Sequence, residues 1–255
     1  MATDTLSVAP VQKRLQWMTA RIVEIIDETP RVRSLVLDVP DWPGHKAGQH
    51  VDVRLTADDG YQAQRSYSIA SAPGVGKLEL TVEMLPEGEV SSYLAGEARV
   101  GDTFEMRGPI GGYFVWTEIL EGPLFLVGGG SGIVPLMSIL RQRAASGSQT
   151  PATLLFSSRS FADIIYRTEL DDLASTGSGL TVVHTLTRER PPAWTGQTRR
   201  IDRAMLEMTS FPSTASPRIF ICGPTPLVEA AAGNLRDLGH APKLIKTERF
   251  GPTGK

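Results

Sequence analysis

The feature that most constrains the fold of this 255-residue chain is a regular alternation that begins after Gly111 and Gly112. Short apolar runs of strand length take turns with longer segments in which apolar residues recur at helical spacing. Parallel strands need long crossover connections, which helices usually provide, so the alternation predicts a parallel sheet with helices packed against it. The expected strands are residues 124–127, 153–156, 180–186 and 218–221, and the expected helices are residues 134–145, 162–173, 201–208 and 227–238.

The first half of the chain has a different pattern, in which short strand-like runs are separated by turn residues. The runs are rich in Val, Ile and Leu and show patches of period-two alternation, whereas Asp, Pro and Gly gather between them. Many short strands with few helices indicate a closed antiparallel barrel. The expected strands are residues 17–26, 32–39, 50–55, 66–71 and 78–84. We therefore predict two domains, an antiparallel β-barrel over residues 14–117 and an α/β parallel-sheet domain over residues 118–255.

The composition excludes several classes of function. Hydrophobic residues make up 41% of the chain and charged residues 21%, with a net charge of -2, which is ordinary for a globular protein and gives no basic excess for nucleic acid. Cys222 is the only cysteine, so this sequence holds neither an internal disulfide nor an iron–sulfur cluster bound by cysteines. The histidines lack metal-ligand spacing, and no apolar run is long enough to span a bilayer. We expect a cytoplasmic protein with no metal site, no membrane insertion and no nucleic-acid partner.

A strand-like segment, Arg65-Ser66-Tyr67-Ser68, combines three kinds of polar group. A strand that carries Arg, Tyr and Ser at alternate positions would point these side chains to one face. The guanidinium suits a phosphate, the ring offers a flat surface for stacking, and the hydroxyl donates or accepts a hydrogen bond. A flavin nucleotide needs such groups along its length. A half-exposed strand with an incidental charge would also account for the segment, which alone leaves both interpretations open.

A second motif, Gly88-Glu89-Val90-Ser91-Ser92, lies at the start of a short expected helix. Its two serines stand at the N-terminal end, where unpaired backbone N–H groups and the helix dipole attract an anion. Serines at this position are also typical of a simple helix cap, and for the motif by itself the cap is the better interpretation.

A third motif, the glycine-rich turn at residues 128–132, follows the first apolar run of the second half. The sequence Gly-Gly-Gly-Ser-Gly leads from an expected strand into an expected helix, as in a dinucleotide-binding turn. The strict Gly-x-Gly-x-x-Gly pattern fails, because Pro135 stands where the third glycine should be. Close packing of the strand against the helix is the alternative explanation for these glycines.

Taken in chain order, the motifs resemble those of the ferredoxin–NADP reductase family. They are the Arg-x-Tyr-Ser strand, the Gly-x-Val-Ser-x-x-Leu helix start, the Gly-Gly-Gly-x-Gly-x-x-Pro turn and a Cys-Gly-Pro segment at residues 222–224. The resemblance extends from about Trp17 to the end of the sequence. It implies a barrel that binds FAD and a parallel-sheet domain that binds a nicotinamide nucleotide at the carboxyl ends of its strands. Some relatives use FMN instead, and the sequence alone does not separate the two flavins.

The resemblance also implies which residues hold the flavin. Arg65 would bind its phosphates, Tyr67 would lie against the isoalloxazine ring, and Ser68 would sit near ring atom N5 as a candidate catalytic residue. The other residues expected at the flavin are Ser66, Val82, Glu83, Met84, Gly88, Val90, Ser91 and Ser92.

For the nicotinamide nucleotide, the resemblance implies a site built on the glycine-rich turn. Gly130, Ser131 and Gly132 would accept the pyrophosphate. Pro135 matches the family's variant of the motif, and proline is tolerated in the first turn of a helix because its missing N–H would have no helical partner there.

The resemblance places further residues near the reacting rings. Cys222, followed by Gly223 and Pro224, would approach the nicotinamide carbon that gives up hydride. Near the end of the sequence, Phe250 would stack on the flavin and Glu248 would assist proton exchange. Cys222 and Glu248 are therefore candidate catalytic residues beside Ser68.

The choice between NAD and NADP depends on charges at the sheet edge. An NAD site commonly offers an acid to the ribose, whereas arginine meets the 2′-phosphate of NADP. No acid directly follows the expected strand at residues 153–156, and the next strand is followed by an arginine. Solvated loop charges are the alternative. We expect NADP, with its 2′-phosphate held by Arg159, Arg188 and either Arg199 or Arg200, beside Ser158 and Thr187.

The electron acceptor follows from the cysteine count. Many relatives carry a fused iron–sulfur domain with four cysteines, which this sequence lacks, so we expect a separate ferredoxin, flavodoxin or oxygenase component to receive the electrons. Reduction of a small acceptor, such as a ferric chelate or free flavin, is the first alternative. A flavin-binding regulatory subunit without turnover is the second, and the arginines argue against it because a flavin sensor needs no NADPH site. We therefore expect an NADPH-dependent flavoprotein oxidoreductase.

Overall fold

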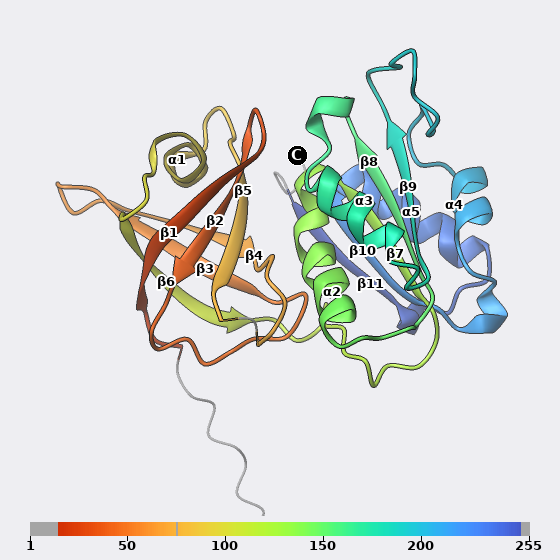
Figure 1. Ribbon diagram of the computed structural model, residues 1–255, viewed down its shortest axis with the longest axis horizontal. Coiled ribbons are helices and arrows are strands. Elements are labelled where there is room, and N and C mark those ends of the chain that lie inside the picture. Colours follow the sequence, from red (N-terminus) through yellow and green to blue (C-terminus); the bar gives the residue numbers. More distant parts are fainter. Residues whose placement is uncertain (1–14, 75, 251–255) are drawn as a thin grey trace, which may run out of the picture.

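The computed structural model describes residues 15–74 and 76–250, and within these ranges the chain forms two sheets that lie side by side (Figure 1). The first, in the N-terminal half, is antiparallel, and the second, in the C-terminal half, is parallel. The expected fold class is therefore confirmed. The predicted outer limits of the two domains, residues 14 and 255, lie outside the described ranges.

The N-terminal sheet curls into a barrel of antiparallel strands. These strands are β1 (Met18–Thr29), β2 (Val32–Asp38), β3 (His50–Thr56), β4 (Gln62–Ser68), β5 (Leu78–Glu83) and β6 (Thr103–Ile110). Their order across the sheet is β4-β3-β6-β1-β2-β5. A bridge between Ile69 and Leu80 joins the chain just after β4 to β5, so the two edge strands meet.

The barrel core forms because alternate residues of each strand point inward. In β3, for example, Val51 and Val53 are fully buried. Helix α1 (Glu89–Ser92) and the helical turn that continues it (Tyr93–Glu97) add Val90 and Leu94 to the same core. The segment that carries the second sequence motif is therefore anchored in the barrel.

The C-terminal sheet is parallel and has helices on both faces. Its strands are β7 (Leu124–Gly129), β8 (Ala152–Ser158), β9 (Leu180–Leu186), β10 (Arg218–Pro224) and β11 (Ile245–Phe250), in the order β11-β10-β7-β8-β9. Its helices are α2 (Ile133–Ala145), α3 (Arg167–Ser175), α4 (Arg203–Thr209) and α5 (Thr225–Asp237).

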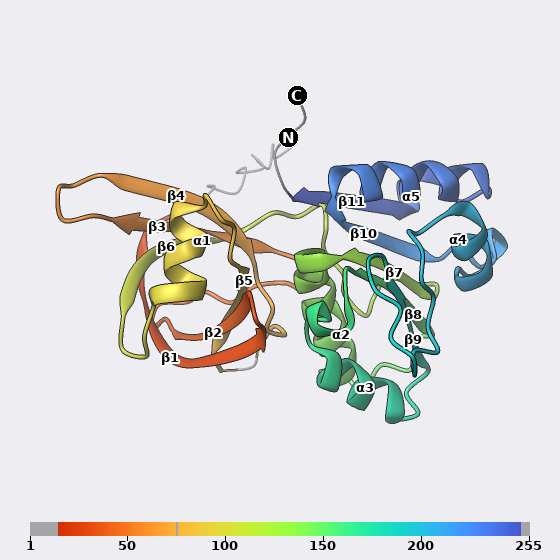
Figure 2. The ribbon, with the colours of Figure 1, turned by 90° about the horizontal axis from the view of Figure 1, so that it is seen from above.

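Strand β7 shows why the strands of this sheet are continuous apolar runs. Leu124 and Leu126 belong to the core that α2 and α3 cover, whereas Phe125 and Val127 belong to the core that α4 and α5 cover (Figure 2). A strand buried on both faces has no polar side, so period-two alternation disappears. Of the helices in the described residues, none combines the length and apolar character needed to cross a lipid bilayer.

Strand β6 was not predicted from the sequence. Its inward residues are apolar, but its outward residues Glu105 and Arg107 are charged, and Gly108-Pro109 is typical of a turn. The charges are compatible with a strand because each has a partner on β3. Arg54 pairs with Glu105 at 2.7 Å, and Asp52 pairs with Arg107 at 2.9 Å.

Strand β4 begins at Gln62 and ends at Ser68, earlier than the expected residues 66–71, and two further elements also differ from the prediction. Strand β11 was not among the expected strands, and it pairs in parallel with β10 at the sheet edge. The helix predicted at residues 162–173 begins only at Arg167, because Tyr166 adopts a left-handed backbone conformation with a φ of 57°.

Candidate functional site

The glycine-rich turn packs directly on the Cys-Gly-Pro segment. A short 3₁₀ turn (Gly130–Gly132) leads from β7 into α2, and a Cβ on Gly132 would lie 2.2 Å from the carbonyl oxygen of Cys222. A Cβ on Gly129 would lie 2.7 Å from Cδ1 of Leu227. Close packing against backbone therefore requires glycine at position 132, whatever the turn binds, whereas at position 129 a side chain would first have to displace the end of Leu227.

Gly130 is different, because packing does not explain it. Its φ is +54°, and the nearest atom to a Cβ built there would be Oε2 of Glu83, 4.0 Å away. The turn is thus open at Gly130, on the side that meets β5 of the barrel. Pro135 lies in the first turn of α2, as expected for a residue without an N–H.

Cys222 and Glu248 lie together at the carboxyl end of the parallel sheet. Cys222 is paired in register with Gly128 on one side and with Glu248 on the other. Burial, followed by the charge of Glu248, raises the pKa of the fully buried thiol well above its usual value. Burial raises the pKa of Glu248 to about 7. The pair therefore offers a neutral thiol and a carboxyl group that exchanges its proton near neutral pH.

Phe250 ends β11, opposite Pro224, and packs partly buried against the core of the parallel sheet. The structure thus brings Phe250, Cys222 and Glu248 together at the carboxyl ends of β10 and β11. Whether Phe250 stacks on a flavin stays a prediction.

On the barrel, Arg65 and Tyr67 share one face of β4, because they lie opposite Val53 and Val51 of β3. The guanidinium of Arg65 bonds only to the carbonyl oxygen of Gln64, at 2.7 Å, and among the described residues it has no acidic partner. Burial raises the pKa of the half-buried Tyr67. An exposed arginine without a counterion fits the phosphates of a flavin nucleotide.

The serines of β4 correct one expectation from the sequence. Arg, Tyr and Ser do not share a face, because side chains alternate along the strand and the serines occupy the even positions. Ser66 points to the opposite face, where its hydroxyl donates to Asp52 at 2.7 Å. Ser68 is buried opposite His50 on that same face.

At the start of α1, the serine hydroxyls are already engaged in holding the turn. Ser91 Oγ donates to the carbonyl oxygen of Gly88 at 3.2 Å, and Ser92 Oγ donates to that of Leu85 at 3.1 Å. A Cβ on Gly88 would lie 2.2 Å from Ser91 Oγ, so a larger residue there would force this hydroxyl out of its place in the turn. Because Gly88 has no side chain to cap the helix, a phosphate at this point would be bound by backbone N–H groups.

The last residues of β5 connect the barrel with the glycine-rich turn. Val82 is buried in the barrel core and Met84 packs against it. Glu83 pairs with Arg31 at 3.2 Å and lies next to Gly130. Of these three residues, Glu83 is the one that adjoins both halves of the candidate site.

The loops after β8 and β9 bring the predicted arginines together. The N–H of Thr187 donates to the carbonyl oxygen of Ser158 at 3.0 Å, and the N–H of Arg188 donates to the carbonyl oxygen of Arg159 at 2.9 Å. Both arginine side chains are exposed, and among the described residues neither has an ion pair. Ser158 Oγ is buried without a hydrogen-bond partner, which fits a ligand that would supply one.

Two further side chains at this edge change the sequence-based picture. Arg199 is held by Asp202 and by Gln197, each at 2.8 Å, so it is less free to bind a phosphate than Arg159 or Arg188. Glu189, which the sequence reasoning did not consider, accepts a hydrogen bond from the N–H of Phe161 at 2.8 Å. Its partner lies 28 residues away, so no local pattern could have indicated this contact.

Comparison with known protein families gives two matches in chain order. Residues 19–115 match an oxidoreductase FAD-binding domain, and residues 126–233 match an oxidoreductase NAD-binding domain. Three features of the described residues fit FAD and a nicotinamide nucleotide as ligands. The buried Ser158 hydroxyl lacks a hydrogen-bond partner, the Arg65 guanidinium lacks an acidic partner, and the turn is open at Gly130. The matches confirm the expected pairing of a flavin-binding half with a nicotinamide-nucleotide-binding half.

Similar proteins include reductase components of oxygenase systems. The chain is 33% identical over 238 residues to the glycine betaine monooxygenase reductase subunit of Pseudomonas aeruginosa, covering 91% of this chain but only 64% of that protein. It is 31% identical over 240 residues to the ferredoxin–NAD(P)(+) reductase component of naphthalene 1,2-dioxygenase/salicylate 5-hydroxylase systems from Ralstonia sp, covering 92% and 71%. The crystal structure of an Amycolatopsis cytochrome P450 reductase matches with a TM-score of 0.82 at 28% identity, over 98% of this chain and 74% of that one.

Proposed function

The chain belongs to the ferredoxin–NADP reductase family of FAD- and NAD-binding oxidoreductases, and we propose that it passes reducing equivalents from NADPH through FAD to a separate electron-acceptor protein. The observation that carries the proposal is that the two candidate cradles adjoin, because the open side of the glycine-rich turn at Gly130 faces Glu83 at the end of β5. A bound flavin takes hydride from a nicotinamide nucleotide and can release the electrons singly or as a pair. The protein must therefore bring the two rings to about 3–3.5 Å, which requires adjoining sites.

On the flavin side, residues of β4 and the start of α1 would bind the cofactor. Arg65 would meet the phosphates with its unpaired guanidinium, and Tyr67 would offer its ring for stacking. The first amides of α1 would complete the phosphate site. We assign this half of the activity to residues 14–117.

On the nicotinamide side, the open turn at Gly130 would receive the pyrophosphate, and the edge formed by Cys222 and Glu248 would face the reacting ring. The Cys222 thiol is fully buried and stays neutral, so it would not act as a nucleophile toward the ring. The Glu248 carboxyl would hold a proton below pH about 7 and release it above. We assign this half to residues 118–255.

We propose NADP rather than NAD as the nucleotide. Arg159 and Arg188 project from neighbouring loop ends joined by a backbone hydrogen bond of 2.9 Å, which suits a shared phosphate. Ser158 has a buried hydroxyl available to the same ligand. Arg199 would contribute only if it left Asp202.

Anaerobic mixing of the flavin-loaded protein with NADPH tests the reductase proposal. We expect loss of the oxidised-flavin absorbance, followed by its return when an acceptor is added. If neither NADPH nor NADH bleaches the flavin, the chain is not a reductase and the regulatory-subunit alternative gains support.

The class of acceptor can be tested by the salt dependence of re-oxidation. Ferredoxin, flavodoxin or an oxygenase component would dock through charged surfaces, so its reduction should slow as ionic strength rises. Reduction of a ferric chelate or of free flavin should depend little on salt. If only the small acceptors are reduced fast, and their reduction does not depend on salt, the acceptor is a small molecule rather than a protein.

A further inference from the structure

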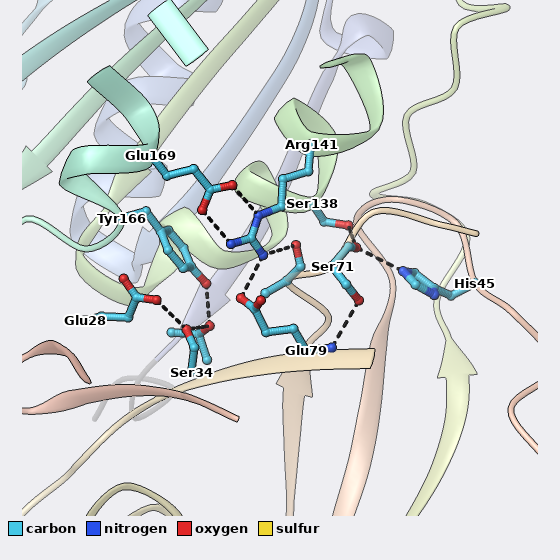
Figure 3. A network of polar contacts seen from close by, with 11 residues as sticks. Glu28, Ser34, His45, Ser71, Glu79, Ser138, Arg141, Tyr166 and Glu169 are labelled. Carbon is cyan, nitrogen blue, oxygen red and sulfur yellow. Dashed lines mark hydrogen bonds and ion pairs between the residues drawn. The ribbon is translucent and has the colours of Figure 1, made fainter. Parts of the chain in front are cut away.

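Helix α2 connects the two candidate cradles. Its N-terminal end follows the glycine-rich turn, and two side chains further along, Ser138 and Arg141, bond to the barrel just after β4 (Figure 3). Ser138 Oγ donates to the carbonyl oxygen of Ser71 at 2.8 Å. Arg141 Nη1 donates to that of Ala70 at 3.0 Å. The same helix therefore contacts the end of the segment that carries Arg65 and begins at the turn proposed to bind the nucleotide.

The chain at Ala70 and Ser71 is itself fixed to the barrel. The N–H of Ala70 donates to the carbonyl oxygen of Glu79 at 2.8 Å, and the N–H of Glu79 donates to Ser71 Oγ at 3.1 Å. The ring of His45 adds a bond to the carbonyl oxygen of Ser71 at 3.1 Å. A shift of α2 relative to this point would therefore break the hydrogen bonds of Ser138 and Arg141 to residues 70–71.

Arg141 ties three elements together through a single guanidinium. It pairs with Glu79 of β5 at 2.7 Å and forms two bonds with Glu169 of α3, at 2.8 and 2.7 Å. Its side chain is only 17% exposed and that of Glu79 only 15%. Burial would lower the pKa of Arg141, but the bond with Glu169 and the charge of Glu79 raise it above its usual value. The arginine stays charged, and the planar fork fixes direction as well as distance.

A second chain of contacts joins the same elements beside Arg141. The ring of Tyr166 lies 5.0 Å from the guanidinium, and its hydroxyl donates to Thr81 of β5. Thr81 bonds to Ser34 at 2.7 Å, and Ser34 donates to Glu28 at 2.7 Å. Tyr166 holds a left-handed backbone conformation that is costly for an aromatic residue, so its surroundings must fix it in place.

We propose that Ser138 and Arg141 are positioning residues, which set the distance between the nicotinamide site and the flavin site by clamping α2 to residues 70–71. The inference rests on the proposed hydride transfer. Transfer of hydride is sensitive to position, and a displacement of about 1 Å can cost a factor of about 100 in rate. Because α2 is a continuous helix, movement at Ser138 and Arg141 displaces the glycine-rich turn at its start.

Two variants and one matched control test the clamp. Arg141→Lys keeps the charge but loses the fork, and Ser138→Ala removes one hydrogen bond. Arg143→Lys is the control, because Arg143 lies on the same helix, is 2% exposed, and binds Thr150 and Ser178 within the C-terminal half. The limiting rate of flavin bleaching and the Kd for NADPH are measured by stopped flow. Hydrogen–deuterium exchange of residues 70–74 and 76–79 is measured without cofactors.

We expect both variants to exchange faster at residues 70–74 and 76–79 and to bleach about 10- to 100-fold more slowly, with a Kd for NADPH within about twofold of wild type. The control should leave exchange at residues 70–74 and 76–79 and the limiting rate unchanged. Any of three results would overturn the positioning role. The limiting rate could be unaffected by Arg141→Lys, the variants could weaken only the binding of NADPH, or Arg143→Lys could slow bleaching equally. Failure of NADPH to bleach the wild type would instead overturn the proposed function, which keeps the two failures apart.

Discussion

Cys222 and Glu248 lie directly opposite each other on β10 and β11, at the carboxyl end of the parallel sheet. The thiol is fully buried, whereas the carboxyl group is only partly buried. Burial, together with the charge of Glu248, keeps the pKa of Cys222 well above its usual value, and burial brings the pKa of Glu248 to about 7. At neutral pH the thiol is therefore protonated while the carboxyl group lies near the midpoint of its titration.

The buried thiol should be inert in the folded protein. Nucleophilic attack needs an accessible thiolate, and Cys222 offers neither access nor charge. An aromatic disulfide reagent at pH 8 should therefore modify no thiol in native protein and one thiol per chain in denaturant, since Cys222 is the only cysteine. Rapid modification of the native protein would show that the sheet edge opens and would contradict the buried placement.

Glu248 should make stability fall as pH rises. Its folded pKa of about 7 lies above the usual value of 4.5, so its protonated form favours folding fully below pH 4.5. As pH rises through 7 this contribution is lost, and the free energy of unfolding falls by about 3 kcal/mol. Urea unfolding between pH 4.5 and 8 should show the decline in wild type and a flatter profile in Glu248→Gln. Glu207→Gln, an exposed site on α4, should keep the wild-type slope.

The glycine-rich turn should tolerate alanine poorly at one position. In Gly132→Ala the new Cβ would overlap the carbonyl oxygen of Cys222, which is backbone and cannot rotate away. We expect a loss of about 1–3 kcal/mol or more in the free energy of unfolding. Gly112→Ala is the control, because nothing lies within 4 Å of a Cβ there, and it should change stability by about 0.5 kcal/mol or less. Equal effects in chemical denaturation would refute the packing requirement.

The sequence predicted the parts of the fold that depend on apolar periodicity. Strand β9 was predicted with its observed bounds, and α2 within one residue, because the apolar residues that mark them lie close together in the sequence. Strand β6 escaped prediction because its outward charges are matched by Arg54 and Asp52, about 50 residues away. A single segment does not reveal that its charges are paired across a sheet.

The candidate site was predictable where a motif is contiguous and not where side chains meet across the fold. The glycine-rich turn and the Cys-Gly-Pro segment were found as contiguous motifs that follow the family's order along the chain. The packing of Gly132 on Cys222, by contrast, joins residues 90 positions apart. The face of Ser66 was predicted wrongly, since it follows from strict alternation in β4. Arg141 gave no local signal at all, because its partners lie on β5, on α3 and after β4.

The arginines after β8 and β9 should set the preference for the nucleotide. Arg188 is exposed, has no ion pair among the described residues, and is held beside Arg159 by a backbone bond. If both guanidinium groups bind the 2′-phosphate, Arg188→Ala should raise the KM for NADPH by about 10- to 100-fold, the value of a lost charge-assisted bond. The KM for NADH should barely change, because NADH has no 2′-phosphate.

Arg199→Ala provides the matched control for that experiment. Arg199 is already paired with Asp202 at 2.8 Å, so its removal should affect the KM for NADPH less than removal of Arg188. Steady-state kinetics with both nucleotides, measured at two salt concentrations, separates a specific phosphate contact from a general loss of positive charge, since only the general effect is strongly screened. Equal effects on the KM for NADPH and on the KM for NADH would contradict a contact with the 2′-phosphate, which only NADPH carries.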